Sequence, residues 1–258
     1  MTDVRDGQPA SPPKEGDEPP EEGQPGWRVL HLLLRIGTKV DGAAMERAVK
    51  ECEATGHQVV TALCLGHKAD LAVLALGPSE AELHRLQRAL QRAGAALAWS
   101  YVSLTEVSEY AEGLPAVLRQ ARLRPILPPA GLDAFCFYPM SKRRAPGEAD
   151  ANWYRLPYDD RLRLMHEHGA SGRAFRGRVL QLVTGSTGLD DWEWGVTLFG
   201  RDLEDLKACV YAMRFDQASA RYAEFGPFVV GTVLPLPAAL EALGVGGAPG
   251  ARGKDEGR

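Results

Sequence analysis

The sequence predicts an α+β fold of two tandem ferredoxin-like units, each with the order β-α-β-β-α-β, packed sheet to sheet as in a dimeric α+β barrel. Runs with strand periodicity alternate with segments of helical periodicity, and this order occurs twice along the chain. The 258 residues also suffice to bury a sizeable core. Each unit leaves one sheet face without helices, so packing the two bare faces together would bury both.

The first unit is expected within residues 27–115. Its strands are predicted by runs rich in Val, Leu and Ala, and its helices by apolar residues that recur on one face. Strands are expected at 27–37, 58–66, 69–77 and 97–107, and helices at 41–56 and from 78–79 onward. Ser79 and Glu82 have the spacing of a capping box, which predicts the start of the second helix.

The second unit, expected within residues 116–244, repeats the same order of elements. Its strands are predicted at 132–140, 178–185, 192–200 and 224–234, and its helices at 158–170 and 202–213. Because this order matches the first unit, we interpret the chain as a structural duplication.

The two ends of the chain have a different composition from its body. Residues 1–26 hold seven acids, two bases, six prolines and four glycines, and residues 245–258 hold five glycines, three bases and two acids. Such segments cannot bury enough apolar surface to offset the entropy of ordering, so both are predicted to be flexible tails. Of the 34 acids and 30 bases, equal numbers then remain in the body. A neutral body argues against a general nucleic-acid-binding protein.

The cysteines and the hydropathy pattern predict a cytoplasmic protein. The four cysteines form no C-x-x-C pair, which is typical of reduced, buried thiols. The N-terminus lacks the apolar segment of a secretory signal, and no apolar run approaches membrane-spanning length.

Most of the histidines are predicted to be structural or solvated. This applies to His31, His57, His67 and His84 of the first half. His166 and His168 end the helix at 158–170, but they do not form the H-E-x-x-H zinc motif. A single histidine on a partly apolar helix face is more often a core residue than a ligand, so spacing alone does not assign His168 to a site.

Two features of the strand at 178–185 and the turn after it attract attention. The Gly-Ser-Thr-Gly turn at 185–188 lacks the P-loop lysine, so we interpret it as a tight turn between strands. Gln181 interrupts an otherwise apolar strand. A buried amide needs hydrogen-bond partners, so Gln181 is either a satisfied core group or a donor that faces a pocket; spacing leaves both open.

The stretch FCFYPMSKRR (135–144) joins an apolar strand to three consecutive cations. Strand side chains alternate, so Tyr138, Met140 and Lys142 are expected on one face, with Phe135 and Phe137 on the other. A tyrosine and a lysine on one face form a plausible anion site. Composition alone, however, favours a strand end followed by a solvated basic turn.

Five segments of the chain resemble the bacterial coproheme decarboxylases, heme synthases related to chlorite dismutases. They are FYPMSKRR, NWYRLP, MHEHGASGR, QLVTGSTGLDDWEWGVTLF and VYAMRFDQASARYAEFGPF, and the strong match runs from about Arg122 to Gly231. SYVSLTEVSEY (100–110) extends the resemblance more weakly. The family fold is a pair of ferredoxin-like units, commonly assembled as a homopentamer, and we expect the same here.

The resemblance implies a peroxide-dependent oxidation in which iron-coproporphyrin III (coproheme) is both substrate and redox cofactor. The propionates at positions 2 and 4 would become vinyls, giving heme b. His168 matches the axial iron ligand of the family, and Tyr138 matches the tyrosine whose radical takes hydrogen from a propionate. Gln181 matches the residue on the open face of the iron. The stretch 115–122 offers no histidine as a base for peroxide activation, so any such base stays open.

The remaining matched residues are expected to contact the porphyrin. Lys142 matches a contact to the departing propionate, Arg122 a propionate-binding arginine, and Trp192 a tryptophan near the pocket. Met140, Arg214 and Ser219 match other contacts at the porphyrin edge. Cationic residues in an otherwise neutral body suit a ligand with four carboxylates. The resemblance also implies a transient contact with the coproporphyrin ferrochelatase.

Two alternative functions remain from the sequence. A chlorite dismutase would share the fold and the axial histidine, but that family has a distal arginine where this chain has Gln181. A heme-binding or heme-handling protein without turnover would use His168 as a ligand, with Tyr138 as a packing residue only.

Overall fold

The computed structural model describes residues 25–111, 113–144 and 151–245. The first half contains β1 (Arg28–Arg35), α1 (Gly42–Ala54), β2 (Gln58–Leu65), β3 (Leu71–Gly77), α2 (Glu80–Arg92) and β4 (Ala96–Thr105). The second half contains α3 (Ala116–Leu123), β5 (Ala134–Lys142), the 3-10 helix η2 (Trp153–Arg155), α4 (Tyr158–Arg173), β6 (Val179–Gly185), β7 (Trp194–Gly200), α5 (Leu203–Met213), α6 (Gln217–Ala220), β8 (Ala223–Phe225), β9 (Val229–Val233) and α7 (Leu236–Ala242).

The strands form one closed antiparallel sheet. Their order is β7-β6-β4-β1-β3-β2-β9-β5-β8, and a further pairing of β7 with β5 closes the ring. Within the first half the order is β2-β3-β1-β4, and within the second it is β6-β7-β5-β9, which is the same arrangement of first, second, third and fourth strands. The two units meet at β4–β6 and at β2–β9. The predicted pair of ferredoxin-like units is therefore confirmed, with their bare sheet faces turned into the interior of a barrel.

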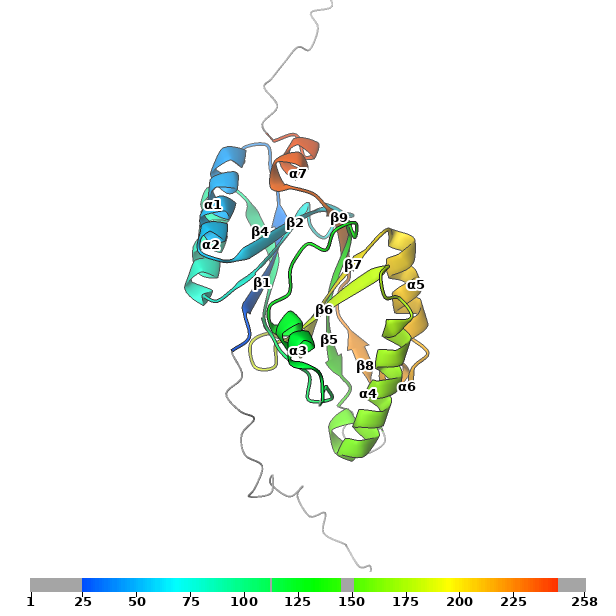
Figure 1. The fold of residues 1–258 in the computed structure, drawn as a ribbon. Helices are drawn as coiled ribbons and strands as arrows, with labels where there is room; N and C mark the ends of the chain where they lie inside the picture. Colours follow the sequence, from blue (N-terminus) through cyan, green and yellow to red (C-terminus); the bar gives the residue numbers. More distant parts are fainter. Residues whose placement is uncertain (1–24, 112, 145–150, 246–258) are drawn as a thin grey trace, which may run out of the picture.

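The helices cover opposite outer sides of this barrel. In Figure 1, α1, α2 and α7 lie on one side, and α4, α5 and α6 lie on the other. The sequence predicts α1, α2, α4 and α5 but not α3, α6 or α7. The predicted capping of α2 is confirmed, since the Ser79 side chain accepts a hydrogen bond from the backbone N–H of Glu82.

The alternation of side chains along the strands separates three main cores. On β1, Leu30, Leu32 and Leu34 pack outward beneath α1, α2 and α7. Val29 and Leu33 point into the barrel, where they join residues of the second unit. A third core lies on the outer face of the second unit beneath α5. The candidate site is built on this third core.

The prediction of one strand over 224–234 is wrong. The structure divides this segment into β8 and β9, which both pair with β5, because the three residues 226–228 lie opposite only two residues of β5. The backbone N–H of Gly226 still donates to the carbonyl of Pro139 at 2.9 Å. A Cβ atom at Gly226 would lie 2.6 Å from the Pro139 ring, so only glycine allows this close approach.

The predicted flexible tails lie almost wholly outside the described residues. Val245, at the start of the predicted C-terminal tail, is described and is buried in the first core. Within the described ranges, every helix is too short or too polar to cross a membrane.

Candidate functional site

The site is built on the outer sheet face of the second unit. Three rows of paired residues cross β6, β7 and β5: Gln181–Leu198–Cys136, Val183–Val196–Tyr138 and Gly185–Trp194–Met140. Paired residues point to the same side of a sheet, so Gln181, Tyr138 and Met140 share this face. Phe135 and Phe137 pack into the barrel instead. The predicted alternation along β5 is confirmed.

A cavity of about 1180 Å³ lies over this face and is bounded also by α3, α4 and the end of α5. Eight of the nine residues that the sequence predicts for the site line it: Arg122, Tyr138, Met140, Lys142, His168, Gln181, Arg214 and Ser219. Trp192 is not among the described lining residues. It packs against the barrel core and lies next to Gly226, so its predicted contact with a ligand stays a prediction.

Tyr138 is held in the wall of the cavity by two aromatic rings. Its ring stacks on Phe228 with centroids 4.4 Å apart and meets Phe225 edge-on at 5.7 Å. The side chain is 7% exposed, and this burial raises the pKa of the phenol well above its usual value. Tyr138 is therefore a neutral phenol that faces the cavity in a fixed orientation.

Lys142 is a buried cation beside the same cavity. Its Nζ donates to the carbonyl of Ala218 at 2.9 Å and lies 4.4 Å from the centroid of the Trp153 ring. Burial lowers its pKa to about 8, although Asp216 and Glu193 act in the opposite direction. The interpretation of 142–144 as a solvated basic turn is thus wrong for Lys142, which is 7% exposed.

The other two cations of this stretch have structural contacts. Arg144 forms a 2.6 Å ion pair with Glu193, whose second carboxylate oxygen accepts the backbone N–H of Lys142 at 2.8 Å. Arg143 binds through its backbone, donating to the carbonyl of Tyr222 at 2.7 Å. Glu193 therefore fixes the end of β5, so that Lys142 has a defined position.

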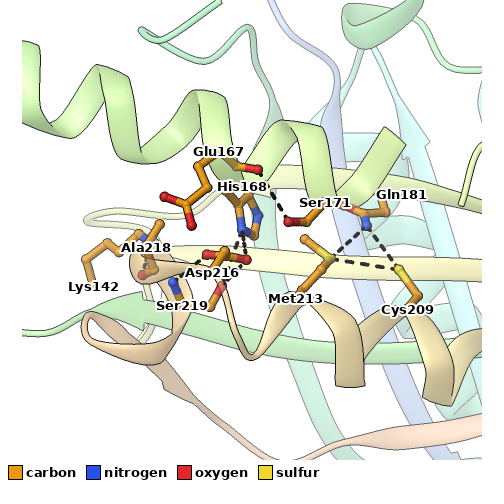
Figure 2. Close-up of polar contacts among 10 residues, drawn as sticks. All are labelled: Lys142, Glu167, His168, Ser171, Gln181, Cys209, Met213, Asp216, Ala218 and Ser219. Atoms are coloured by element: carbon orange, nitrogen blue, oxygen red, sulfur yellow. Dashed lines mark hydrogen bonds and ion pairs between the residues drawn. The ribbon is translucent and has the colours of Figure 1, made fainter. Parts of the chain in front are cut away.

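His168 forms a hydrogen-bonded group with Asp216 and Ser219, of which the sequence predicts only His168 and Ser219 as site residues. Figure 2 shows its ring extending from α4 toward Asp216 and Ser219 at the start of α6. Nδ1 lies 3.0 Å from Oδ2 of Asp216 and 3.3 Å from Oγ of Ser219. The carboxylate accepts the Nδ1 hydrogen, which directs the Nε2 lone pair away from Asp216 and makes it available to a ligand.

Asp216 was missed as a site residue. Its other carboxylate oxygen accepts the backbone N–H of Ser219 at 2.8 Å and so caps α6. Burial by itself would raise the pKa of Asp216, but the hydrogen bonds from His168 and Ser219 outweigh it, and the pKa lies below its usual value. The sequence carries a signal for the cap, an Asp three residues before a Ser, but none for the contact with a histidine on another helix.

Gln181 faces the cavity with weak hydrogen-bond partners. Its Nε2 lies 3.3 Å from the sulfur of Met213 and 3.5 Å from that of Cys209 (Figure 2). Sulfur is a weak acceptor, so the amide is available for a stronger one. Of the two alternatives from the sequence, a donor that faces a pocket therefore describes Gln181 better than a satisfied core amide.

The charge and apolar surface of the cavity favour a large anionic ligand. Four cations are among its described lining residues, Arg122, Arg124, Lys142 and Arg214, against the two acids Glu106 and Glu109. Val117 and Ile126, which also line it, are 79% and 87% exposed. Large apolar side chains that stay this exposed are typical of a binding surface.

Two further lining residues were missed from the sequence. The hydroxyl oxygen of Tyr110 is buried and has no hydrogen-bond partner among the described residues. Arg124 lies just beyond α3, with its guanidinium 5.1 Å from the centroid of the Trp27 ring. Neither position has a local sequence signal, because both residues lie outside the strands and helices and so belong to no periodic pattern.

Comparison with known proteins gives concordant results. A family model described as chlorite dismutase matches residues 40–234. A solved structure described as a novel heme-binding protein from Thermus thermophilus is 37% identical, with 86% of this chain and 96% of that chain covered and a TM-score of 0.73. A mutant chlorite dismutase from Candidatus Nitrospira defluvii is 21% identical, with 85% and 96% covered and a TM-score of 0.66. At that lower identity the second structure shows a shared fold.

Proposed function

Since the chain belongs to the chlorite dismutase family, we propose that it binds an iron porphyrin and decarboxylates coproheme to heme b with hydrogen peroxide. The observation that carries this proposal is the convergence of Tyr138, Lys142 and His168 on one cavity. An oxidisable phenol and an imidazole held by a carboxylate suit this reaction, and the ammonium group suits a substrate that carries carboxylates.

The residues around the cavity fit an iron porphyrin with several propionates. His168 would ligate the iron through Nε2, since Nδ1 is occupied by Asp216. Exposed apolar side chains would cover the ring faces, and the four cations would bind carboxylates. The unpartnered hydroxyl of Tyr110 is a donor for one more carboxylate. The heme-binding relative from Thermus thermophilus supports the same class of ligand.

The bound iron porphyrin, with hydrogen peroxide, supplies the oxidising equivalents. Tyr138 would give up an electron and its phenolic proton, while Lys142, four residues further along β5, would hold a carboxylate in the same cavity. The tyrosyl radical would then take a hydrogen atom from the propionate carbon next to the ring. Breaking the bond to the carboxylate then releases CO₂ and one electron and leaves a vinyl group; the second oxidising equivalent from the peroxide would accept that electron. Each propionate, with one peroxide and one proton, gives one vinyl, one CO₂ and two waters.

The structure also supports a division of roles between side chains. Phe225 and Phe228 hold the Tyr138 ring, which preserves its orientation toward the substrate through both decarboxylations. Gln181 would face the oxidant with an amide that is bound only to sulfur. A distal arginine, as expected for a chlorite dismutase, is absent at this position, and this favours decarboxylation over chlorite chemistry.

The test is the porphyrin product after peroxide addition. Apoprotein loaded with ferric coproheme and titrated with peroxide should yield first a mono-decarboxylated porphyrin and then heme b, each step removing CO₂ and two hydrogen atoms as read by mass spectrometry. If coproheme binds but is only bleached, the protein is a heme-handling protein without turnover. If chlorite is consumed with release of oxygen while coproheme persists, the protein is a chlorite dismutase.

A further inference from the structure

Glu106 lies at one end of the cavity, where Trp194 and Gly185 define the position of its carboxyl group. It directly follows β4, and its Oε1 accepts the indole N–H of Trp194 at 3.3 Å. The carboxyl group packs over Gly185, where an added Cβ atom would lie 2.2 Å from Oε2. Gly185 does not have a positive φ, so its backbone conformation does not require glycine. Glycine at this position instead makes room for the carboxyl group of Glu106.

This carboxyl group lies toward one end of the cavity, away from Gln181 and His168. Gly185 is four residues along β6 from Gln181, or about 13 Å at the rise of a β-strand. Gln181 lies beside α4, with its Nε2 3.8 Å from the position of an added Cβ at Gly172. Because Gly172 is one turn beyond His168 on that helix, Gln181 and His168 mark the centre of the site. Glu106 lies at its periphery, where the propionates of a porphyrin project.

A carboxylate at this place conflicts with an anionic ligand unless one proton is shared. Glu106 is solvent-exposed in the open cavity, and a ligand that fills the cavity would remove water from around its carboxyl group. Two carboxylates that share a desolvated site cannot both stay ionised, and one pKa rises strongly. A carboxylic acid that donates to a carboxylate, by contrast, forms a strong charge-assisted hydrogen bond.

On the basis of the proposed function, we infer that Glu106 takes up a proton when a porphyrin with several propionates binds, and then donates a hydrogen bond to a propionate. The indole N–H of Trp194 and the space above Gly185 place the carboxyl group at this end of the cavity. Already in the free protein, burial raises the pKa of Glu106, the hydrogen bond from Trp194 opposes this, and the charge of Glu109 adds to it.

Proton uptake by the other titratable groups around the cavity must be distinguished from proton uptake by Glu106. They are Glu109 and Tyr110 from the loop after β4, Arg122 and Arg124 from α3 and its end, Tyr138 and Lys142 from β5, Tyr154 from η2, His168 from α4 and Arg214 from the end of α5. Lys142, with its pKa lowered to about 8 by burial, is largely protonated at about pH 6.5 before and after binding. A metal-free porphyrin removes iron ligation by His168 from the measurement.

The experiment measures proton uptake when metal-free coproporphyrin III binds. Binding heats at about pH 6.5 in two buffers of different ionisation enthalpy give the number of protons taken up. We expect the wild-type protein to take up close to one proton more than E106Q, which keeps an acceptor for Trp194 and a donor for the ligand. The wild-type Kd should also rise up to about tenfold per pH unit through this window, and that component should vanish in E106Q.

Two matched variants separate position from charge. E109Q removes the other acid of the cavity, which pairs with Arg161 at 3.6 Å, and should keep the proton uptake of the wild type. G185A keeps the charge of Glu106 but displaces its carboxyl group, and should lose the uptake as E106Q does.

Three outcomes would overturn the inference. Equal proton uptake in the wild type and E106Q would exclude Glu106 as the proton acceptor. Binding by E106Q that is tighter than that of the wild type by a factor independent of pH would mean that Glu106 stays ionised and repels the ligand. If the wild type binds neither coproporphyrin III nor ferric coproheme, the proposed function fails and this inference fails with it. If coproporphyrin III binds with the expected proton uptake at Glu106 but coproheme is not decarboxylated, only the proposed function is overturned.

Discussion

At the scale of single residues, the properties of the site depend on how each reactive group is held. His168 donates to a carboxylate rather than to a neutral acceptor, and Asp216 is itself fixed by the backbone of α6. A carboxylate partner fixes the tautomer of a ligating imidazole and makes Nε2 a better electron donor. Asp216, which caps α6, therefore also orients His168 as the candidate iron ligand.

Replacing Asp216 by Asn tests this arrangement. The amide keeps the size of the side chain but removes its charge, so we expect ferric coproheme to bind about tenfold more weakly. The iron–histidine stretching frequency of the reduced complex should also fall, because the imidazole becomes a weaker donor; resonance Raman spectroscopy measures it. Asp202→Asn is the matched control, since Asp202 caps α5 but is not among the residues that line the cavity. An unchanged frequency in D216N would contradict the role given to Asp216.

At the scale of elements, the cavity depends on the seams where the two units join. At the β2–β9 seam, Cys64 pairs with Gly231. A Cβ atom at Gly231 would lie 2.3 Å from the carbonyl oxygen of Leu63, a backbone atom that cannot move without disturbing the strand pairing. Phe228, which stacks on Tyr138, lies just before β9, so this seam also supports the position of Tyr138.

Gly231→Ala should therefore destabilise the protein by about 2 kcal/mol or more, as expected for overpacking against the backbone. Chemical denaturation followed by circular dichroism measures the loss in the free energy of unfolding. Gly37→Ala is the control, because its Cβ atom would meet open space and its φ is not positive. Equal stability of the two variants would mean that the seam tolerates a wider strand separation.

The sequence predicts those elements that carry their own periodicity. The alternation along β5 correctly places Tyr138, Met140 and Lys142 on one face, because a strand imposes it locally. The contact of His168 with Asp216 joins residues 48 positions apart, and no local pattern encodes it. Closure of the barrel likewise depends on pairings between units. We did not predict α3, which has only eight residues, none of them buried, and which lines the cavity with Val117 instead of packing on a core.

At the scale of the whole molecule, the barrel interior joins the two units through a neutral histidine. His31 of β1 is 2% exposed; its Nε2 lies 2.8 Å from the Thr197 hydroxyl on β7, and its ring stacks on Phe137 of β5 at 4.0 Å. Nδ1 has no partner among the described residues. Burial lowers the pKa of His31 to about 3. The prediction of a structural histidine is consistent with this environment.

This burial makes the stability of the barrel sensitive to acid. Between the ordinary pKa of 6.5 and about 3, the unfolded chain binds a proton at His31 that the folded chain does not. Stability should therefore fall as pH falls through this window, with a contribution from His31 of up to about 1.4 kcal/mol per pH unit. His31→Gln should remove that part of the slope in denaturation curves measured at several pH values. The same slope in the wild type and H31Q would mean that His31 is protonated in the folded barrel.

The central claim is that the buried phenol of Tyr138 performs the oxidation in the porphyrin site. The most direct measurement is the mass of the porphyrin after Tyr138→Phe protein, loaded with ferric coproheme, is treated with peroxide. Phe keeps the stacking on Phe228, so binding should remain close to that of the wild type. We predict that the porphyrin keeps all of its propionates. Formation of the mono-decarboxylated porphyrin or heme b by this variant at the wild-type rate would contradict the account.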